Sequence, residues 1–216
     1  MSAGRRAVHP IEAESYRILR GLVDLSGLGP LCRAVAERVV HASADPSWAA
    51  DLVLDEQALA GGLAALHAGA PVVVDARMVA AAVTFRPTLC ALDLAHRAAA
   101  AGAVPVRGDS GRPLADDGPV APRTRSAAGV RAALDRVGPG AVWVVGCAPT
   151  ALDALLRLPA EPALVVGLPV GFVGAVEAKR ALAASGLPAV TNHGARGGSA
   201  VAAAALNALL YRQEPA

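Results

Sequence analysis

The sequence is poor in aromatic residues, contains one lysine and has no long apolar run. Aromatic residues make up 3% of the 216 residues although 54% are hydrophobic, so alanine, valine, leucine and 22 glycines must build the core. The apolar stretches are broken by charge, proline or glycine before they reach the roughly 18 residues that a membrane-spanning helix needs. We therefore expect tightly packed helices on a sheet and no membrane span.

An excess of positive charge is also missing. The chain carries 20 basic and 18 acidic residues, interspersed, whereas a nucleic-acid-binding surface needs a basic stripe. Residues 1–9 include Arg5 and Arg6 but lack the apolar stretch of a secretory signal, so we expect a cytoplasmic protein. Because Lys179 is the only lysine, nearly every cation is an arginine. Arginine suits bidentate contact with carboxylate or phosphate, although genome composition explains this bias equally well.

Neither cysteine nor histidine forms a metal-binding pattern. Cys32, Cys90 and Cys147 are far apart and have no C-x-x-C spacing, which argues against a disulfide framework and a zinc site and favours buried thiols. The histidines show no H-E-x-x-H pair. They are His9, His41, His67, His96 and His193. We predict no metal site.

Short apolar runs alternate with helical patterns from about residue 70 onward. Strands are expected at 72–75, 88–92, 141–146, 163–167 and 188–191, and helices at 76–82, 94–101, 125–137, 150–158, 174–184 and 199–211. The runs at 142–145 and 164–166 are apolar on both faces, which is typical of parallel strands covered by helices on each side. The pattern predicts an α/β fold in three layers with a flavodoxin-like, doubly wound, mostly parallel five-stranded sheet.

Three further helices are expected before the sheet, at 11–22, at 31–42 opened by Pro30, and at 56–67 capped by Asp55. Residues 102–122 are rich in turn formers and have no periodicity, so we expect a mobile surface loop there. The length of the chain favours one domain over residues 1–216.

Glycine-rich turns follow the predicted strands, at 146–150, 167–174 and 194–199. In an open parallel sheet, ligands bind beyond the carboxyl ends of the strands, and backbone N–H groups at helix starts attract anions. No Walker A sequence and no dinucleotide-binding fingerprint occur, so nucleotide binding is disfavoured. The glycines either form a broad anion-binding surface or serve only tight turns and close packing.

His41 ends a predicted helix whose apolar residues, among them Leu31, Val35 and Val39, face a core. An imidazole can exchange a proton near neutral pH, which suits acid/base catalysis. A lone histidine at a helix end also serves as a cap or as a satisfied core residue. The residues alone do not separate these roles.

Several motifs along the chain resemble, in order, those of the precorrin-8X methylmutase family, from about Pro10 to Leu210. They are Glu14 to Leu19, Asp24 to Ser26, Val39 to Ala42, Gly69 to Asp75 with Met78-Val79, Thr124 to Ala127, Gly146 to Leu152, Gly167 to Gly174 with Glu177 to Lys179, and Gly197 to Asn207. Each motif alone is weak, but the ordered set is specific.

The resemblance implies an isomerase of cobalamin biosynthesis that moves a methyl group from C-11 to C-12 of precorrin-8X or cobalt-precorrin-8 without a redox cofactor or added metal. It makes His41 the catalytic acid/base, the corrinoid precursor the ligand, and a homodimer the expected assembly. The residues that it implies for substrate binding are Ser15, Thr84, Arg125, Ser126, Gly146, Ala148, Thr150, Gly171, Gly197, Gly198 and Ser199.

The chain departs from the family pattern at two motifs, and its long segment 102–122 is also atypical. Ala80 to Ala82 follow Met78-Val79 where the family often has a His-Gly pair, and Ala195 stands where a basic residue is common. These departures concern substrate contacts more than the reaction. Two other functions remain open at this point, a non-catalytic tetrapyrrole carrier and a nucleotide-dependent α/β enzyme. The latter rests on fold analogy alone.

Overall fold

The computed structural model describes residues 9–100 and 124–212, in which ten helices and six strands form. The helices are α1 (Pro10–Leu22), α2 (Pro30–Ser43), α3 (Trp48–Asp51), α4 (Glu56–His67), α5 (Arg77–Ala82), α6 (Ala91–Ala100), α7 (Arg125–Val137), α8 (Pro149–Leu156), α9 (Ala175–Ala184) and α10 (Ser199–Leu210). The strands are β1 (Leu52–Val53), β2 (Val72–Val74), β3 (Thr88–Cys90), β4 (Val142–Val145), β5 (Leu164–Gly167) and β6 (Ala189–Asn192). The loop predicted at 102–122 lies outside the described residues.

The six strands form one sheet in the order β1-β6-β5-β4-β2-β3. All neighbouring pairs from β3 to β6 are parallel, as predicted, and β1 is antiparallel to β6. The prediction of five strands was wrong by one, because β1 has only two residues and so shows no periodicity. The order reverses at β2, which has β3 on one side and β4 on the other.

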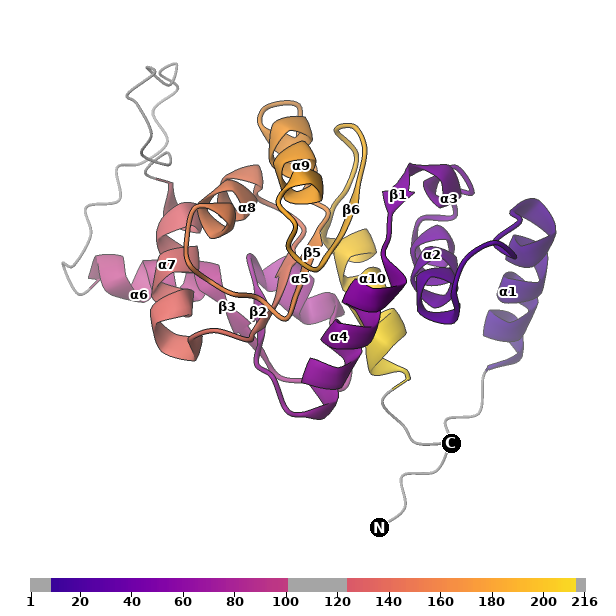
Figure 1. Cartoon of the computed structure of the whole chain (residues 1–216), viewed down its shortest axis with the longest axis horizontal. Helices are drawn as coiled ribbons and strands as arrows, with labels where there is room; N and C mark the ends of the chain where they lie inside the picture. The colour runs from indigo at the N-terminus through magenta and orange to yellow at the C-terminus, as the bar shows by residue number, and fades with distance from the viewer. Residues whose placement is uncertain (1–8, 101–123, 213–216) are drawn as a thin grey trace, which may run out of the picture.

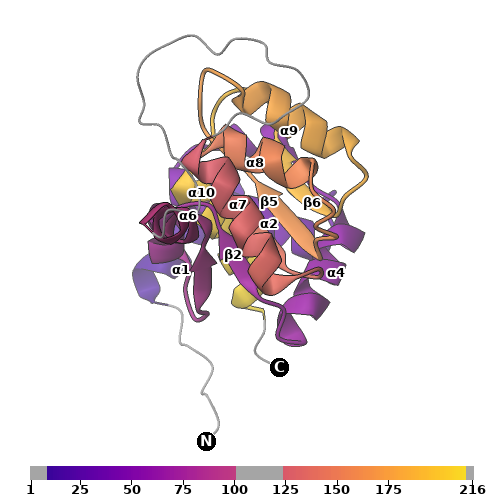
Figure 2. The same ribbon diagram turned by 90° about the vertical axis from the view of Figure 1, so that its left-hand side faces the viewer.

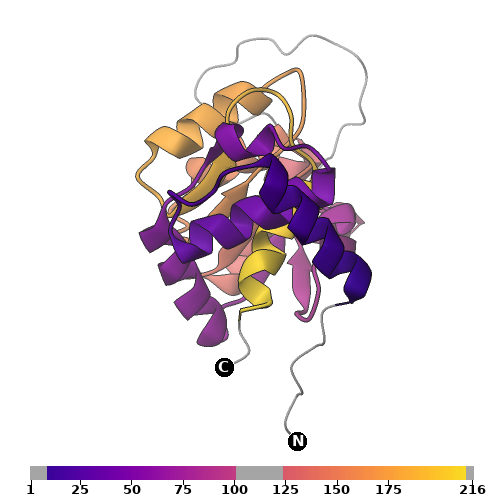
Figure 3. The ribbon, with the colours of Figure 1, turned by 90° about the vertical axis from the view of Figure 1, so that its right-hand side faces the viewer.

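Helices pack on both faces of the sheet. The side chains of β2, β4 and β5 are all buried and alternate between two apolar clusters. One cluster includes Val144 and Val166 together with residues of α2, α4 and α10, and the other includes Trp143 and Val165 together with residues of α7, α8 and α9. Figure 2 shows α7 and α8 in front of the strands, and Figure 3 shows the opposite side, with α1 and α2 outermost.

Helix α10 is the centre of one face. Every residue from Val201 to Leu210 is buried, as expected for a helix that is apolar all round, and small alanines let it pack closely against α2. In Figure 1, α1 to α3 gather at one side of the molecule and α6 to α8 at the other, with α10 between them and partly covered by α4. None of the helices within 9–100 and 124–212 is both long enough and apolar enough to span a bilayer.

The predicted helix starts follow from their caps. Pro30 occupies the first position of α2, the Asp55 side chain accepts a hydrogen bond from the Ala58 N–H (2.6 Å), and Thr124 accepts one from the Ala127 N–H (3.1 Å). Helix α2 stops after Ser43, where Ala44 adopts a left-handed conformation (φ 51°). His41 therefore lies in the last turn of a helix, as predicted.

The largest boundary error concerns α6, which was predicted to begin at residue 94 but begins at Ala91. Strand β3 correspondingly ends at Cys90, not at 92. The apolar Leu92 extends the strand-like run in the sequence, but it is already helical and packs against the core from α6. The other predicted helix and strand ends agree with the structure within two residues.

Candidate active site

His41 is held by two consecutive residues of α1. The Ser15 Oγ and the His41 Nδ1 are 2.9 Å apart, and the Tyr16 ring stacks on the imidazole with centroids 4.8 Å apart and planes 13° apart. All three side chains are partly buried. Ser15 thus fixes the imidazole at Nδ1, and Tyr16 covers one face of the ring. Among the described residues, Nε2 has no hydrogen-bond partner.

Arginines surround Tyr16. The Arg38 guanidinium lies over the Tyr16 ring (5.5 Å) and over the Tyr211 ring (4.3 Å), and its Nη1 donates to the Glu12 carboxylate (3.1 Å). Burial raises the pKa of the Tyr16 phenol to about 12, with the nearby Arg38 opposing that rise. Tyr16 therefore stays neutral at physiological pH and acts as a platform for His41.

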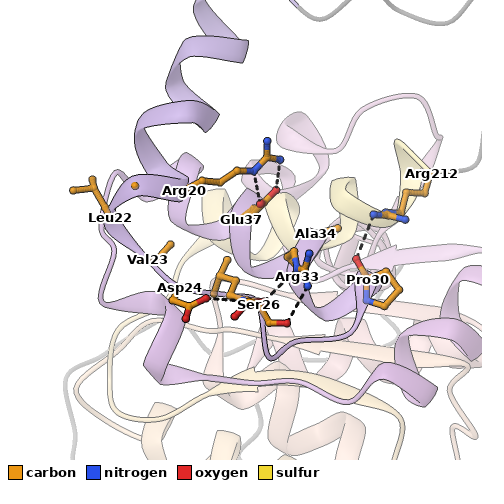
Figure 4. A pocket seen from close by; sticks show the side chains of 12 residues that line it. Arg20, Leu22, Val23, Asp24, Ser26, Pro30, Arg33, Ala34, Glu37 and Arg212 are labelled. Carbon is orange, nitrogen blue, oxygen red and sulfur yellow. Dashed lines mark hydrogen bonds and ion pairs between the residues drawn. The ribbon is translucent and has the colours of Figure 1, made fainter.

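Two neighbouring cavities open beside this group. One, of about 440 Å³, is lined by Tyr16, Arg38 and Tyr211 among others. The second, of about 600 Å³, lies where α1 turns into α2 and is drawn in Figure 4. Arg20, Glu37 and Arg212 line both cavities. These volumes lie in the range of ligand pockets.

The second cavity is polar, but its charges are largely satisfied within the protein. Arg20 donates two hydrogen bonds to Glu37 (2.7 and 2.9 Å), and Arg33 donates to the backbone carbonyls of Leu25, Ser26 and Leu28. Figure 4 shows Arg20 and Glu37 facing each other between α1 and α2. Such paired guanidinium groups contribute less to anion binding than free ones.

Thr84 lies beside the last turn of α10. Its N–H and Oγ1 both donate to the Asn207 Oδ1 (3.0 and 3.2 Å), while the Asn207 Nδ2 donates to the Ala82 carbonyl (2.8 Å). This bond fixes the segment after α5 against α10. Phe85, the next residue, contacts the Tyr211 ring edge-on (5.4 Å), which links Thr84 to the arginine and tyrosine group around His41.

The turn after β4 is closed by Asp75. Its carboxylate accepts hydrogen bonds from the N–H groups of Gly146 (3.1 Å), Cys147 (2.8 Å) and Ala148 (2.8 Å). Burial raises the pKa of Asp75, and these three donors oppose that rise. Of the two roles left open for this turn, anion binding by these three N–H groups is therefore disfavoured, because a carboxylate from the end of β2 already accepts their hydrogen bonds. Gly146 and Ala148 do lie directly after β4, at the carboxyl end of the sheet, as predicted.

Arg125 and Ser126 open α7 beside this turn. The Thr124 Oγ1 donates to the Thr150 Oγ1 (3.1 Å), which ties the start of α7 to the start of α8. The Arg125 side chain is exposed, and no hydrogen bond joins it to another described residue. The starts of α7 and α8, which carry Arg125, Ser126 and Thr150, are thus adjacent.

The remaining glycines of the predicted site, Gly171, Gly197 and Gly198, lie in the turns that follow β5 and β6. A side chain at Gly197 would collide with the carbonyls of Leu168 and Pro169, and the Gly198 N–H donates to the Leu168 carbonyl (2.8 Å). The Gly171 N–H donates to the Ala195 carbonyl (3.1 Å). The two turns are therefore packed against each other backbone to backbone, which requires glycine at position 197.

Ser199, the first residue of α10, contacts the turn after β4. Its Oγ lies 2.9 Å from the Cys147 Sγ, and its Cα lies against Gly146. Burial raises the pKa of the Cys147 thiol, so a thiolate nucleophile is disfavoured there. All three cysteines are free, but Cys147 is only half-buried, which corrects the expectation of three buried thiols.

The predicted site residues thus fall into two groups. Ser15 and His41 form one, with Thr84 adjacent through Asn207 and Tyr211. The rest form the second, at the carboxyl ends of β4 to β6. No group of three metal-ligating side chains occurs in the part of the chain that the structure describes.

Sequence reasoning missed Tyr16, Arg38, Tyr211 and Asp75. A signal existed for Arg38, because it precedes His41 by three residues and therefore shares its helix face. The partners of Asp75 lie more than 70 residues away, and no local pattern predicts them.

Comparison with known proteins matches residues 10–212 to the family model described as precorrin-8X methylmutase. The chain belongs to the precorrin-8X methylmutase family. It is 40% identical to the precorrin-8X methylmutase of Pseudomonas aeruginosa over 94% of this chain and 95% of that protein. It is 34% identical to the cobalt-precorrin-8 methylmutase of Methanothermobacter thermautotrophicus over 97% of this chain and 96% of that protein.

The fold agrees with a solved member of the precorrin-8X methylmutase family. The precorrin-8X methylmutase of Thermus thermophilus superposes with a TM-score of 0.77 at 34% identity and covers 95% of this chain and 98% of that one. The resemblance inferred from the ordered motifs and the mixed α/β fold with a mostly parallel sheet are therefore confirmed.

Proposed function

We propose that this chain is an isomerase of cobalamin biosynthesis that moves a methyl group from C-11 to C-12 of precorrin-8X or cobalt-precorrin-8, giving hydrogenobyrinate or cobyrinate. Membership of the family and relatives named for this reaction over nearly their whole length support it. The bond from the methyl group to C-11 breaks and a bond to C-12 forms. Because no electrons are gained or lost overall, the reaction needs no redox cofactor.

The observation that carries this proposal is the Ser15–His41 contact of 2.9 Å. With Nδ1 engaged by Ser15 and one ring face covered by Tyr16, the imidazole presents Nε2 for exchange with the substrate. In this proposal His41 protonates the conjugated macrocycle or hydrogen-bonds to it, which lowers the barrier to methyl migration.

The rest of the site would bind a flat ring that carries several carboxylates. Arg125 is exposed and suited to a carboxylate fork, with Ser126 and Thr150 beside it. Ser15, Thr84 and Ser199 add hydroxyl groups. The ring could also lie close to the backbone at the strand ends, where the residues are small, namely Gly146, Ala148, Gly171, Gly197 and Gly198. The N–H groups of Gly146 and Ala148 would not donate to the ring, because they already donate to Asp75.

We also propose a cytoplasmic homodimer built from single-domain chains with flavodoxin-like layering. Ile11, Ile18 and Leu22 are 75%, 50% and 65% exposed and lie on one face of α1, the face that also carries Ser15. A subunit contact there would bring the two-fold boundary next to His41. The strand order from β3 to β6, with its reversal at β2, supports the layering.

The test is turnover of precorrin-8X by the purified protein, followed by the spectral change of the chromophore. His41→Ala should lower kcat by about 100- to 10,000-fold while ring binding persists. His67→Ala is a matched control, because His67 also lies in the last turn of a helix and is exposed. Normal turnover by His41→Ala contradicts the assigned mechanism. Equal affinity of the wild-type protein for precursor and product without conversion indicates a carrier instead.

A further inference from the structure

Arg196 joins the turn that precedes α10 to the segment that follows the His41 helix. Its Nε donates to Asp51 Oδ2 (2.7 Å), and its Nη1 donates to Asp45 Oδ2 (2.7 Å) and Ser47 Oγ (2.7 Å). The guanidinium also lies over the Trp48 ring at 4.4 Å. One side chain therefore spans two parts of the chain about 150 residues apart.

A buried lysine holds the backbone of the turn that carries Arg196. Lys179 is 1% exposed, and its Nζ donates to Asn192 Oδ1 (3.0 Å) and to the Arg196 carbonyl (2.7 Å). The Asn192 Nδ2 in turn donates to Asp51 Oδ2 (2.9 Å). Lysine is almost never fully buried unless it is paired, because burial of an ammonium group is costly. Its place here indicates that the backbone of the turn must be held firmly.

One end of this hydrogen-bond network lies near His41, and the other lies next to the glycine turns at the strand ends. Asp45 follows His41 by four residues, just beyond the left-handed Ala44 that ends α2. On the other side, Arg196 directly precedes Gly197 and Gly198, whose backbone packs on Leu168. No other ion pair among the described residues links the segment after α2 to the strand-end turns.

We propose that Arg196 is a positioning residue that sets the placement of His41 relative to the glycine turns at the strand ends. Arg196 with Asp45, Asp51, Asn192 and Lys179 forms what we name the Arg196 clamp. The clamp rests on the proposed function of this site, but it also makes a structural claim that stands without turnover. Arg196 itself, with both charged partners in place, is not a substrate ligand in this proposal.

The geometry requires arginine. Two different nitrogens of one planar group reach two carboxylates, whereas a lysine ammonium at the same position could bridge them only as a point charge. Arg196→Met keeps an aliphatic contact with Trp48 but removes both ion pairs, and Arg196→Lys keeps the charge but not the fork. Arg157→Met is the matched control, because Arg157 also pairs through Nε and Nη2 with a carboxylate, Asp153, but at the end of α8 opposite the strand-end turn.

The first measurement is steady-state turnover of precorrin-8X at a temperature where every variant is folded. Arg196→Met should lower kcat by about 10- to 100-fold and leave KM within about threefold, since a small misplacement of the acid/base group affects the transition state. Arg196→Lys should recover part of the loss, and Arg157→Met should match the wild type. A rise in KM at unchanged kcat would make Arg196 a substrate ligand and overturn the proposal.

Asp45→Asn combined with Arg196→Met separates the clamp from general destabilisation. Because Asp45 acts through Arg196, the double variant should lose no more kcat than Arg196→Met alone. Losses that multiply would contradict the clamp. Wild-type kcat in Arg196→Met would overturn it as well.

Amide hydrogen exchange tests the clamp even if the wild-type protein converts no precorrin-8X, an outcome that would refute the proposed function alone. Arg196→Met should speed exchange at His193 and Gly198, whose N–H groups donate to Asp51 and Leu168 carbonyls, by at least about tenfold relative to Arg157→Met. Equal protection of both amides in the two variants would overturn the clamp.

Discussion

The two groups of the candidate site are built in different ways. Around His41, side chains of two helices contact one another, and every member is at least partly accessible. At the carboxyl ends of β4 to β6, backbone turns pack on one another, and the polar side chains that fix them, Asp75 and Lys179, are 4% and 1% exposed. Substitutions should therefore change the chemistry at the first group and the stability at the second.

The largest expected effect is that of His41→Ala on kcat with little change in stability. The substitution removes one contact with Ser15 and one stacked ring at a partly exposed position, so the free energy of unfolding should fall by about 1 kcal/mol, the lower end of what these two interactions contribute. Urea denaturation beside the turnover assay measures both quantities. A large loss of stability would mean that the two groups do not differ as described.

Asp75→Ala should have the reverse effect. It leaves the N–H groups of Gly146, Cys147 and Ala148 without their acceptor in a buried place, which should lower the free energy of unfolding by about 2 to 4 kcal/mol. Asp153→Ala, at an exposed ion pair on α8, serves as control and should leave stability unchanged. Equal urea midpoints for the two variants would show that the hydrogen bonds to Asp75 do not stabilise the turn after β4.

Lys179→Met tests the buried charge through its pH dependence. Burial lowers the pKa of Lys179 from 10.5 to about 8, so between these values the unfolded chain holds more protons than the folded one. The stability of the wild type relative to Lys179→Met should therefore rise between about pH 8 and pH 10.5, by up to roughly 3 kcal/mol. Thermal or urea unfolding of both proteins across this range measures it, and a pH-independent difference would argue against a buried ammonium.

Ser15→Ala should give the smallest effect. The loss of one hydrogen bond to His41 Nδ1 should lower kcat by about tenfold, because the imidazole loses its orientation while keeping its stacking on Tyr16. Ser185→Ala is a suitable control, since that hydroxyl bonds only to the backbone carbonyl of Leu182 and the backbone N–H of Leu187, at the end of α9. Identical kcat values for the two variants would remove Ser15 from the mechanism.

Much of the fold could be predicted because its signals are local. Val142 to Val145 are apolar on both faces and form a central parallel strand, and Pro30, Asp55 and Thr124 begin their helices. Strand β1 could not be predicted in the same way, since Leu52 and Val53 become a strand only by pairing with β6.

The candidate site was predicted less completely than the fold. The position of His41 at a helix end followed from periodicity and its role from family resemblance, but neither indicated that Ser15 and Tyr16 hold the ring. The glycine turns were found at the right places, yet the donors expected from Gly146 and Ala148 are taken by Asp75. The next residue, Arg196, does not replace the basic substrate contact that is missing at Ala195, because its guanidinium pairs internally with Asp51 and Asp45.

The sequence by itself determined the alternation of strands and helices, the helix end at His41 and the membership of the family, since each depends on the order and spacing of residues. Only the tertiary structure decided that Ser15 meets His41 across 26 residues, that Asp75 fills the start of α8 and that Arg196 reaches Asp45. The physical reason is that hydrophobic periodicity is a local property of the chain, whereas the partner of a polar group depends on which segments the packed core brings together.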